Sequence, residues 1–270
     1  MRLRSLALVG LMVLPLFTGC RAFMEPSVKT QGAEWVAPEY HVSDDAATTR
    51  RMASERRLSL VQQRLQSGDL KSAEAEAKAA LKADPSSADA LTFLAVIAAR
   101  KGAETEAGGY YKRAAEAAPK QGGVLNNYGA WLCANGFPAE SLVWFDRAIS
   151  APGYGTPESA LANAGGCALK TGQYERADRD LRNALSISPR NAYALASRAE
   201  SEYRQGRYFE ARAFTERRLA AAPASPAVLQ LAADIEEKLG DKAAASRYVQ
   251  RLRAEFPEVV TANPGEKLRP

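Results

Sequence analysis

Apolar and small side chains recur along this chain with a period of 34 residues. When each unit is numbered from its first residue, position 4 is leucine in five of six successive units, and position 20 is small in all six. The units begin at Ser54, Ala88, Gly122, Glu158, Ala192 and Pro226. Within a unit the apolar positions follow helical spacing, and no alternating pattern typical of a strand is evident. The pattern predicts an all-α protein with two helices in each unit.

Each unit contains a glycine near its middle and a proline near its end. The glycine stands at position 15, where it lets the chain take a positive φ between the two helices. The six are Gly68, Gly102, Gly136, Gly172, Gly206 and Gly240. A proline near the end of each unit stops the second helix. The small residue at position 20 allows the paired helices to approach closely, so each unit is predicted to be a helix-turn-helix.

This pattern resembles the tetratricopeptide repeat. The resemblance implies an α–α solenoid, in which six repeats stack into a right-handed superhelix and bury their apolar faces against one another. The repeats cover residues 54–87, 88–121, 122–157, 158–191, 192–225 and 226–259. The third is two residues longer than the others, and we expect the loop near Pro152 to bulge without breaking the stack. Such a fold is an interaction scaffold.

The first residues predict export and a lipid anchor. Arg2 and Arg4 precede an apolar run at 6–16, which is too short to span a bilayer and is typical of a signal peptide, here residues 1–19. The sequence Thr18-Gly19-Cys20 resembles a bacterial lipobox, although Phe17 stands where leucine is usual. Lipidation of Cys20 is therefore expected; an ordinary signal peptide or an uncleaved anchor is the alternative. Arg21, rather than an aspartate, favours delivery to the outer membrane.

Two segments lack the repeat pattern. Residues 20–53 hold the lipidated cysteine, prolines and scattered charges, and show no helical period before about Ala46, so they predict a flexible tether. Trp35 and Tyr40 within it either dock on the first repeat or help to bind a partner. Residues 260–270 are predicted to be a loose tail.

Composition and charge exclude several classes of function. The chain has 36 basic and 31 acidic residues without a concentrated basic face, which argues against nucleic-acid binding. Its single histidine, His41, excludes a histidine-centred triad and a multi-histidine metal site. The acidic stretches at 178–180 and 234–237 are interpreted as solvated helix faces, with paired acid/base carboxylates as the alternative. We therefore expect no enzyme activity, no cofactor, no metal and no small-molecule substrate.

Cys133 and Cys167 are the only thiols left once Cys20 is set aside. They lie at positions 12 and 10 of the first helices of adjacent repeats, an axial offset of about 3 Å at ~1.5 Å per residue. The periplasm is oxidising and permits a disulfide. The sequence therefore predicts a Cys133–Cys167 bond, with a pair of buried free thiols as the alternative.

Residues 126–133 (NNYGAWLC) and 161–167 (LANAGGC) depart from the general repeat pattern. Together with the lipobox, tether and six repeats, they resemble the type IV pilus biogenesis/stability lipoproteins of the PilF/PilW family. That resemblance implies a pilotin, an outer-membrane lipoprotein that helps the pilus secretin reach the outer membrane and form its multimeric ring. The implied partners are the secretin subunit and, through the lipid, the outer membrane. A general periplasmic adaptor for cell-wall or outer-membrane machinery is the alternative.

Asparagines in this region are the candidate partner-binding residues. Asn127 and Asn163 both occupy position 6 of a first helix, on the face expected to line the concave groove, and Asn126 adjoins them. An amide can donate to a carbonyl and accept from an N–H, so it can hold a peptide backbone. The alternative is a helix-surface asparagine that bonds locally or to water.

Overall fold

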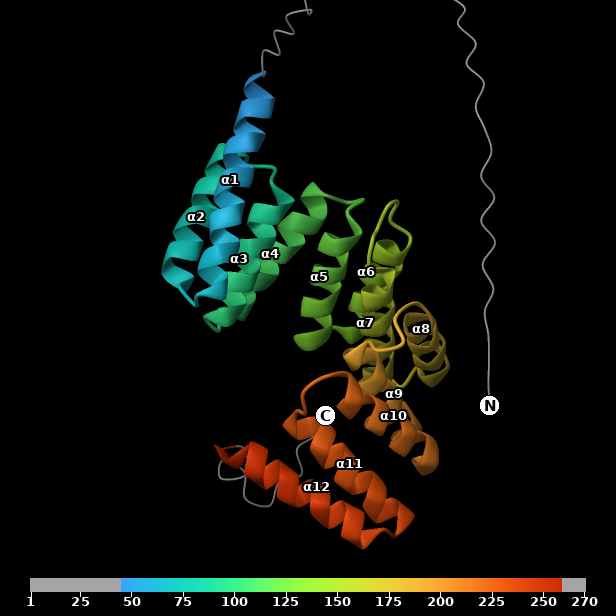
Figure 1. Cartoon of the computed structure of the whole chain (residues 1–270). Helices are drawn as coiled ribbons and strands as arrows, with labels where there is room; N and C mark the ends of the chain where they lie inside the picture. The colour runs from blue at the N-terminus through green and yellow to red at the C-terminus, as the bar shows by residue number, and fades with distance from the viewer. Residues whose placement is uncertain (1–44, 259–270) are drawn as a thin grey trace, which may run out of the picture. The chain divides into compact units, whose positions relative to one another are not determined.

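The computed structural model describes residues 45–258, and these form twelve α-helices without a strand (Figure 1). The predicted signal peptide at 1–19, Cys20, the tether up to residue 44 and the tail at 260–270 lie outside the described residues. The helices are α1 Ala46–Gln66, α2 Leu70–Ala83, α3 Ala88–Arg100, α4 Glu104–Ala117, α5 Gly122–Ala134, α6 Pro138–Ile149, α7 Pro157–Lys170, α8 Tyr174–Ile187, α9 Ala192–Arg204, α10 Tyr208–Ala221, α11 Pro226–Leu239 and α12 Lys242–Glu255.

The helices pair in chain order. Each odd-numbered helix, the A helix of a repeat, packs against the B helix that follows it and against the next A helix (Figure 1). Helices α3, α5, α9 and α11 begin at the residues predicted as repeat starts. The six turn glycines all have a positive φ, between 71° and 92°. The predicted all-α solenoid of tetratricopeptide type is therefore confirmed.

Helix α1 begins earlier than the first predicted repeat. It starts at Ala46, with Asp45 as the N-cap whose side chain accepts a hydrogen bond from the Thr48 N–H. Residues 46–53, assigned to the tether from the sequence, are thus helical. The repeat register alone sets the predicted boundary, and a helix runs past that register where its own N-cap lies further upstream.

The repeat positions predicted to be buried form the core. All five leucines at position 4 are at most 9% exposed, and the six small residues at position 20 are at most 5% exposed. Ala177 of α8 and Ala211 of α10 are completely buried. In a solenoid such contacts join neighbouring units, so each repeat depends on the next for its stability.

Replacing Ala177 or Ala211 with leucine is expected to destabilise the stack by about 1–3 kcal/mol through overpacking. Thermal melting followed by circular dichroism measures the effect. Ala139 is exposed on α6 and provides the matched control, because Ala139→Leu adds the same side chain to a helix facing solvent. Equal melting temperatures for the buried and exposed variants would contradict the packing role.

Four glycines inside helices make room for a large side chain of a neighbouring helix. A Cβ atom at any of these positions would overlap that side chain. Glycine weakens a helix interior by about 1 kcal/mol relative to alanine, so its presence there has to be offset by packing. The pairs are Gly108 with Trp131, Gly129 with Phe145, Gly165 with Leu181, and Gly166 with Tyr193.

The long third repeat ends in a loop between α6 and α7 that folds back on its own repeat. Tyr154 packs against Gly122 at the start of α5, where a Cβ would overlap the tyrosine ring. Gly153 takes a positive φ of 69° and turns the chain. Helices α6 and α7 remain packed together, so the insertion bulges without interrupting the stack, as expected.

Two acidic residues correct an expectation from the sequence. Asp180 and Glu236 lie in stretches interpreted as solvated helix faces, yet each is only 4% exposed. Asp180 pairs with Arg176 and Arg179, and Glu236 pairs with Arg212 of α10. Arg176 also bonds Asp146 of the preceding repeat at 2.6 Å, so it joins two repeats. Buried charges of this kind are tolerated because they are paired.

Candidate functional site

The candidate asparagines lie on adjacent A helices, but the pairing differs from the expected one. Asn163 of α7 donates a hydrogen bond from Nδ2 to Oδ1 of Asn126 on α5, at 3.0 Å. Asn126 is 9% exposed, whereas Asn127 is half-buried and its side chain forms no hydrogen bond within residues 45–258. The structure therefore joins Asn163 to Asn126 and leaves Asn127 beside the pair with its amide available.

Cys133 and Cys167 form a disulfide between α5 and α7 in the structure. Their Cα atoms are 6.0 Å apart and both residues are at most 6% exposed. Together with the Asn126–Asn163 bond, the disulfide fixes the A helices of repeats three and four at two points along their length.

Basic side chains connect successive A helices in a second way. Three of them, all at position 13, donate to a carbonyl at position 12 of the preceding repeat. The bonds run from Arg100 to Leu65, from Lys170 to Cys133 and from Arg204 to Leu169, at 3.2, 3.4 and 3.5 Å. Carbonyls in a last helical turn lack partners within the helix. The Leu65 and Leu169 carbonyls also accept from the backbone N–H groups of Gly68 and Gly172, so the basic side chains add a second bond that links adjacent repeats. The signal in the sequence is the recurrence of a base at position 13 of repeats two, four and five, which the pattern of apolar positions does not reveal.

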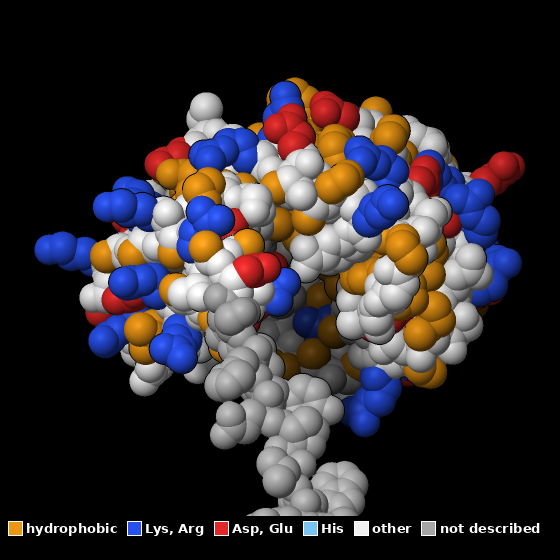
Figure 2. Space-filling model, turned by 90° about the horizontal axis from the view of Figure 1, so that it is seen from above, with side chains coloured by type: hydrophobic (Ala, Val, Ile, Leu, Met, Phe, Trp, Pro, Cys, Tyr) orange, Lys and Arg blue, Asp and Glu red, His pale blue; other side chains and the backbone are white. Residues whose placement is uncertain are grey.

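An apolar cavity lies across the A helices of repeats four, five and six. Its volume is about 470 Å³. Its walls come mainly from α7, α9 and α11, and its apolar lining includes Leu169, Tyr193, Val228 and Leu231. Figure 2 shows the whole stack of repeats from above, with a hollow near the middle in which hydrophobic and basic side chains are visible. We call the cavity lined by these four residues the α7–α11 pocket.

Tyr193 shapes one wall of the α7–α11 pocket. Its hydroxyl lies against Gly166 of α7, where any Cβ would overlap it. The side chain is 48% exposed because it borders the open pocket, yet loss of water around the hydroxyl raises the pKa of Tyr193, with an opposing effect from the Ser197 side chain. The phenol therefore stays neutral at physiological pH and can donate a hydrogen bond.

Charged side chains border the same pocket. Lys170, Arg204 and Arg218 are basic, and Glu200 is the acidic side chain among the lining residues. Glu200 pairs with Arg204 through Oε1, while its Oε2 atom is buried without a hydrogen-bond partner in residues 45–258. An unpaired buried carboxylate oxygen is uncommon and calls for a donor.

The predicted site and the α7–α11 pocket occupy the same face of the stack. Asn126 stands at position 5 of its repeat and Asn163 at position 6 of its own; Ala196 and Ser197, at the same positions of repeat five, line the pocket. The predicted asparagines thus stand at repeat positions equivalent to those of two pocket-lining residues. The pocket itself is centred further toward the C-terminus than expected, since it depends on Gly166 and Tyr193.

Models of known families match two parts of the chain. Tetratricopeptide repeat models match residues 58–122 and residues 168–235. The chain is a tetratricopeptide repeat protein. No match was found among curated protein sequences.

The solved structures to which this tetratricopeptide repeat protein is similar include two pilus proteins. The crystal structure of PilW, a widely conserved type IV pilus biogenesis factor, matches with 29% identity, covering 76% of this chain and 94% of PilW at a TM-score of 0.70. PilF of Pseudomonas aeruginosa matches with 23% identity over 77% of this chain and 94% of its own, at 0.68. A tetratricopeptide repeat protein from Parabacteroides merdae matches with 22% identity over 76% and 80%, at 0.59. The predicted resemblance to pilus-associated repeat proteins is confirmed.

The fold of this tetratricopeptide repeat protein serves protein interaction. In the described part of the chain, no group of three or more His, Cys, Asp or Glu side chains is arranged to hold a metal ion. Within residues 45–258, no helix has the length and apolar character needed to cross a membrane.

The double variant Asn127→Ala/Asn163→Ala is expected to weaken partner binding by about tenfold or more, because each net hydrogen bond contributes about 0.5–1.5 kcal/mol.

The two single variants are expected to differ in their effect on stability. Asn163→Ala removes the bond to Asn126 and lowers the free energy of unfolding by a similar amount, whereas Asn127→Ala leaves it unchanged. Binding and melting measurements on both single variants test this. Asp234→Ala, in repeat six, is the binding control and is expected to do little; a larger effect there than in the double variant would contradict the assignment.

Proposed function

We propose that this tetratricopeptide repeat protein is an outer-membrane lipoprotein facing the periplasm, which acts as a pilotin for the type IV pilus secretin. In this role its repeat groove binds the secretin subunit, and the bound subunit is guided to the outer membrane, where it joins the multimeric ring. The similarity to PilW, a type IV pilus biogenesis factor, over 94% of that protein carries the proposal. The lipobox-like sequence ending at Cys20 supports the membrane anchor.

The groove supports protein binding in this role. A continuous face of A helices offers amides in repeats three and four and an apolar pocket in repeats four to six. Amides hold a peptide backbone, and a pocket takes a side chain, so an extended segment of a partner could use both. The Cys133–Cys167 disulfide cross-links helices α5 and α7 of the stack, which favours a preformed binding surface.

An immunoblot of secretin in membranes with and without the gene tests the proposal. We expect the multimer to be lost and monomers to accumulate when the gene is deleted, and surface pili to be lost with it. Restoring the gene should restore the multimer. An unchanged multimer band would instead support the general periplasmic adaptor, which recruits cell-wall or outer-membrane machinery and leaves secretin assembly untouched.

A further inference from the structure

The α7–α11 pocket combines an apolar interior with a positively charged border. Three basic side chains and one acidic side chain line it. The acidic one, Glu200, is already paired with Arg204, so the remaining charge at the border is positive. The floor and walls between these charges are supplied by small and aliphatic side chains such as Ala196, Val228 and Leu231.

The basic side chains keep donors for a ligand. Lys170 uses one N–H on the Cys133 carbonyl, at 3.4 Å, and Arg218 bonds the carbonyls of Ala222 and Pro223 at 3.1 Å. Lysine has three N–H donors and arginine has five, so each retains donors beyond these bonds. Lys170 is also exposed, which leaves its charge open to an incoming group.

We infer that the α7–α11 pocket receives an acidic, extended segment of a protein partner, with one bulky apolar side chain of the segment in the pocket and its carboxylates at the basic border. This inference rests on the proposed function and names the chemistry of the segment that the groove binds. The charge complementarity between a positive border and an acidic segment selects the occupant.

Tyr193 determines the shape of the pocket. It stands where it does because Gly166 has no side chain, and a Cβ at that position would displace the phenol. The tyrosine ring is a flexible neighbour, so Gly166→Ala moves it with little change in stability. An aromatic wall of this kind contributes strongly to binding when an apolar group packs against it.

Three labelled synthetic peptides, with both ends blocked, test the inference by fluorescence anisotropy with the purified full chain. The first has a leucine flanked by aspartates and glutamates. The second has serine in place of the leucine, and the third has lysines in place of the acids. We expect the first to bind at least tenfold more tightly than either of the others, and its affinity to fall as salt is raised, because salt screens exposed charges.

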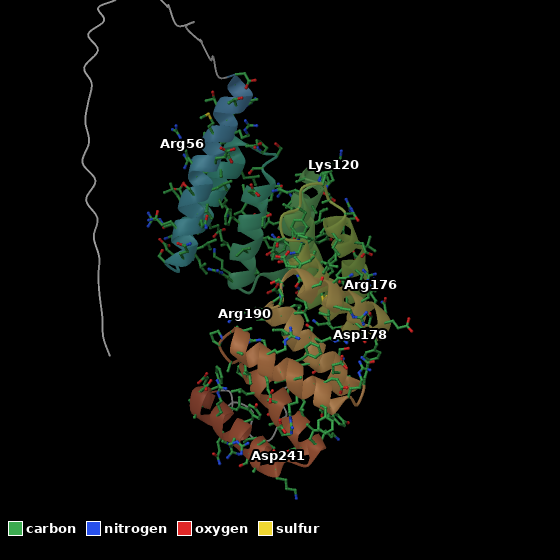
Figure 3. The ribbon with its side chains drawn as sticks, turned by 45° about the vertical axis from the view of Figure 1, so that its right-hand side comes forward. Arg56, Lys120, Arg176, Asp178, Arg190 and Asp241 are labelled. Carbon is green, nitrogen blue, oxygen red and sulfur yellow. A yellow bond between two sulfur atoms is a disulfide. The ribbon has the colours of Figure 1, made fainter. Side chains whose placement is uncertain are left out.

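Paired variants locate the binding site. Lys170→Glu is expected to weaken the acidic peptide about tenfold. Lys120→Glu changes the net charge equally, but Lys120 lies in the turn between α4 and α5, outside the pocket, and should have no effect (Figure 3). Gly166→Ala is expected to cost about tenfold in wild type and nothing further in a Tyr193→Ala background, since the two residues act through one contact.

Equal affinity for the three peptides, including no binding of any, overturns the inference, and so does an equal effect of Lys170→Glu and Lys120→Glu. Preference for the lysine peptide overturns the assignment of charge. The secretin immunoblot does not depend on these peptides. Loss of the multimer on gene deletion together with equal peptide affinities therefore rejects this inference and leaves the proposed function standing.

Discussion

Replacing Cys20 with serine is expected to abolish fatty acylation and release the protein from the membrane into the soluble fraction. A diacyl anchor holds because each buried CH₂ contributes about 0.8 kcal/mol, and the serine variant has no thiol to carry the chains. Metabolic labelling with a radioactive fatty acid, followed by fractionation, measures both effects. We expect all the label to be lost, which makes this the largest single change among the predictions.

A second cysteine variant serves as the control for acylation. Cys167→Ser also replaces a cysteine, here one of the disulfide, but leaves the lipobox-like sequence intact, so it should keep the label and the membrane location. Label that persists in Cys20→Ser would contradict the lipid anchor. The amount of secretin multimer in cells that express Cys20→Ser then shows whether the soluble form still supports secretin assembly. This measurement tests whether the proposed function needs the anchor.

Breaking the Cys133–Cys167 disulfide is expected to lower the free energy of unfolding by up to about 4 kcal/mol. The two cysteines are 34 residues apart, and closing a loop of that length restricts the unfolded chain. For a protein of this size, each 1 kcal/mol corresponds to about 2–4 °C in melting temperature. Melting with and without a reducing agent therefore should differ by roughly ten degrees.

Mass and melting measurements together decide the prediction. Intact mass should rise by about two units on reduction, because each sulfur gains a hydrogen. The double variant Cys133→Ser/Cys167→Ser should melt low and be insensitive to reductant, which shows that reduction acts through this bond. If reductant changes neither the mass nor the melting temperature of protein purified without reductant, the disulfide is contradicted.

The sequence predicted the repeats well because their determinants recur at fixed positions. A turn glycine and a small residue such as Ala177 stand at the same position in all six units, and a leucine such as Leu125 does so in five of them. The disulfide was also predictable, since its partners lie on A helices that must be neighbours once the repeats stack.

The finer pairings could not be predicted, because they depend on how adjacent A helices are offset. Asn163 at position 6 meets Asn126 at position 5, and the basic side chains at position 13 meet carbonyls at position 12 of the preceding repeat. A shift of one residue is about 1.5 Å along a helix, and no single repeat encodes it. Asp180 was placed in solvent for a related reason: Arg176, which shields it, also reaches Asp146 in the preceding repeat.

The pocket was missed because it arises between elements distant in sequence. Gly166 alone is an unremarkable small residue, and Tyr193 alone is an aromatic residue near a helix start. The contact between them shapes one wall of the pocket, and Leu231, one repeat further along the chain, lines the same pocket. Side chains from three repeats define the site, so a pattern repeated within each unit gives no sign of it.

The glycines that accommodate a large neighbour have a consequence for how this protein can evolve. Gly129 fits Phe145, and Gly165 fits Leu181; a Cβ at either glycine would overlap its partner. Phe145 and Leu181 are completely buried, unlike Tyr193, so a drift from glycine to alanine at Gly129 or Gly165 is tolerated only after, or together with, a reduction in size of the partner. The two positions of each of these pairs should therefore vary jointly among descendants of this sequence, and the glycine should not change before its partner.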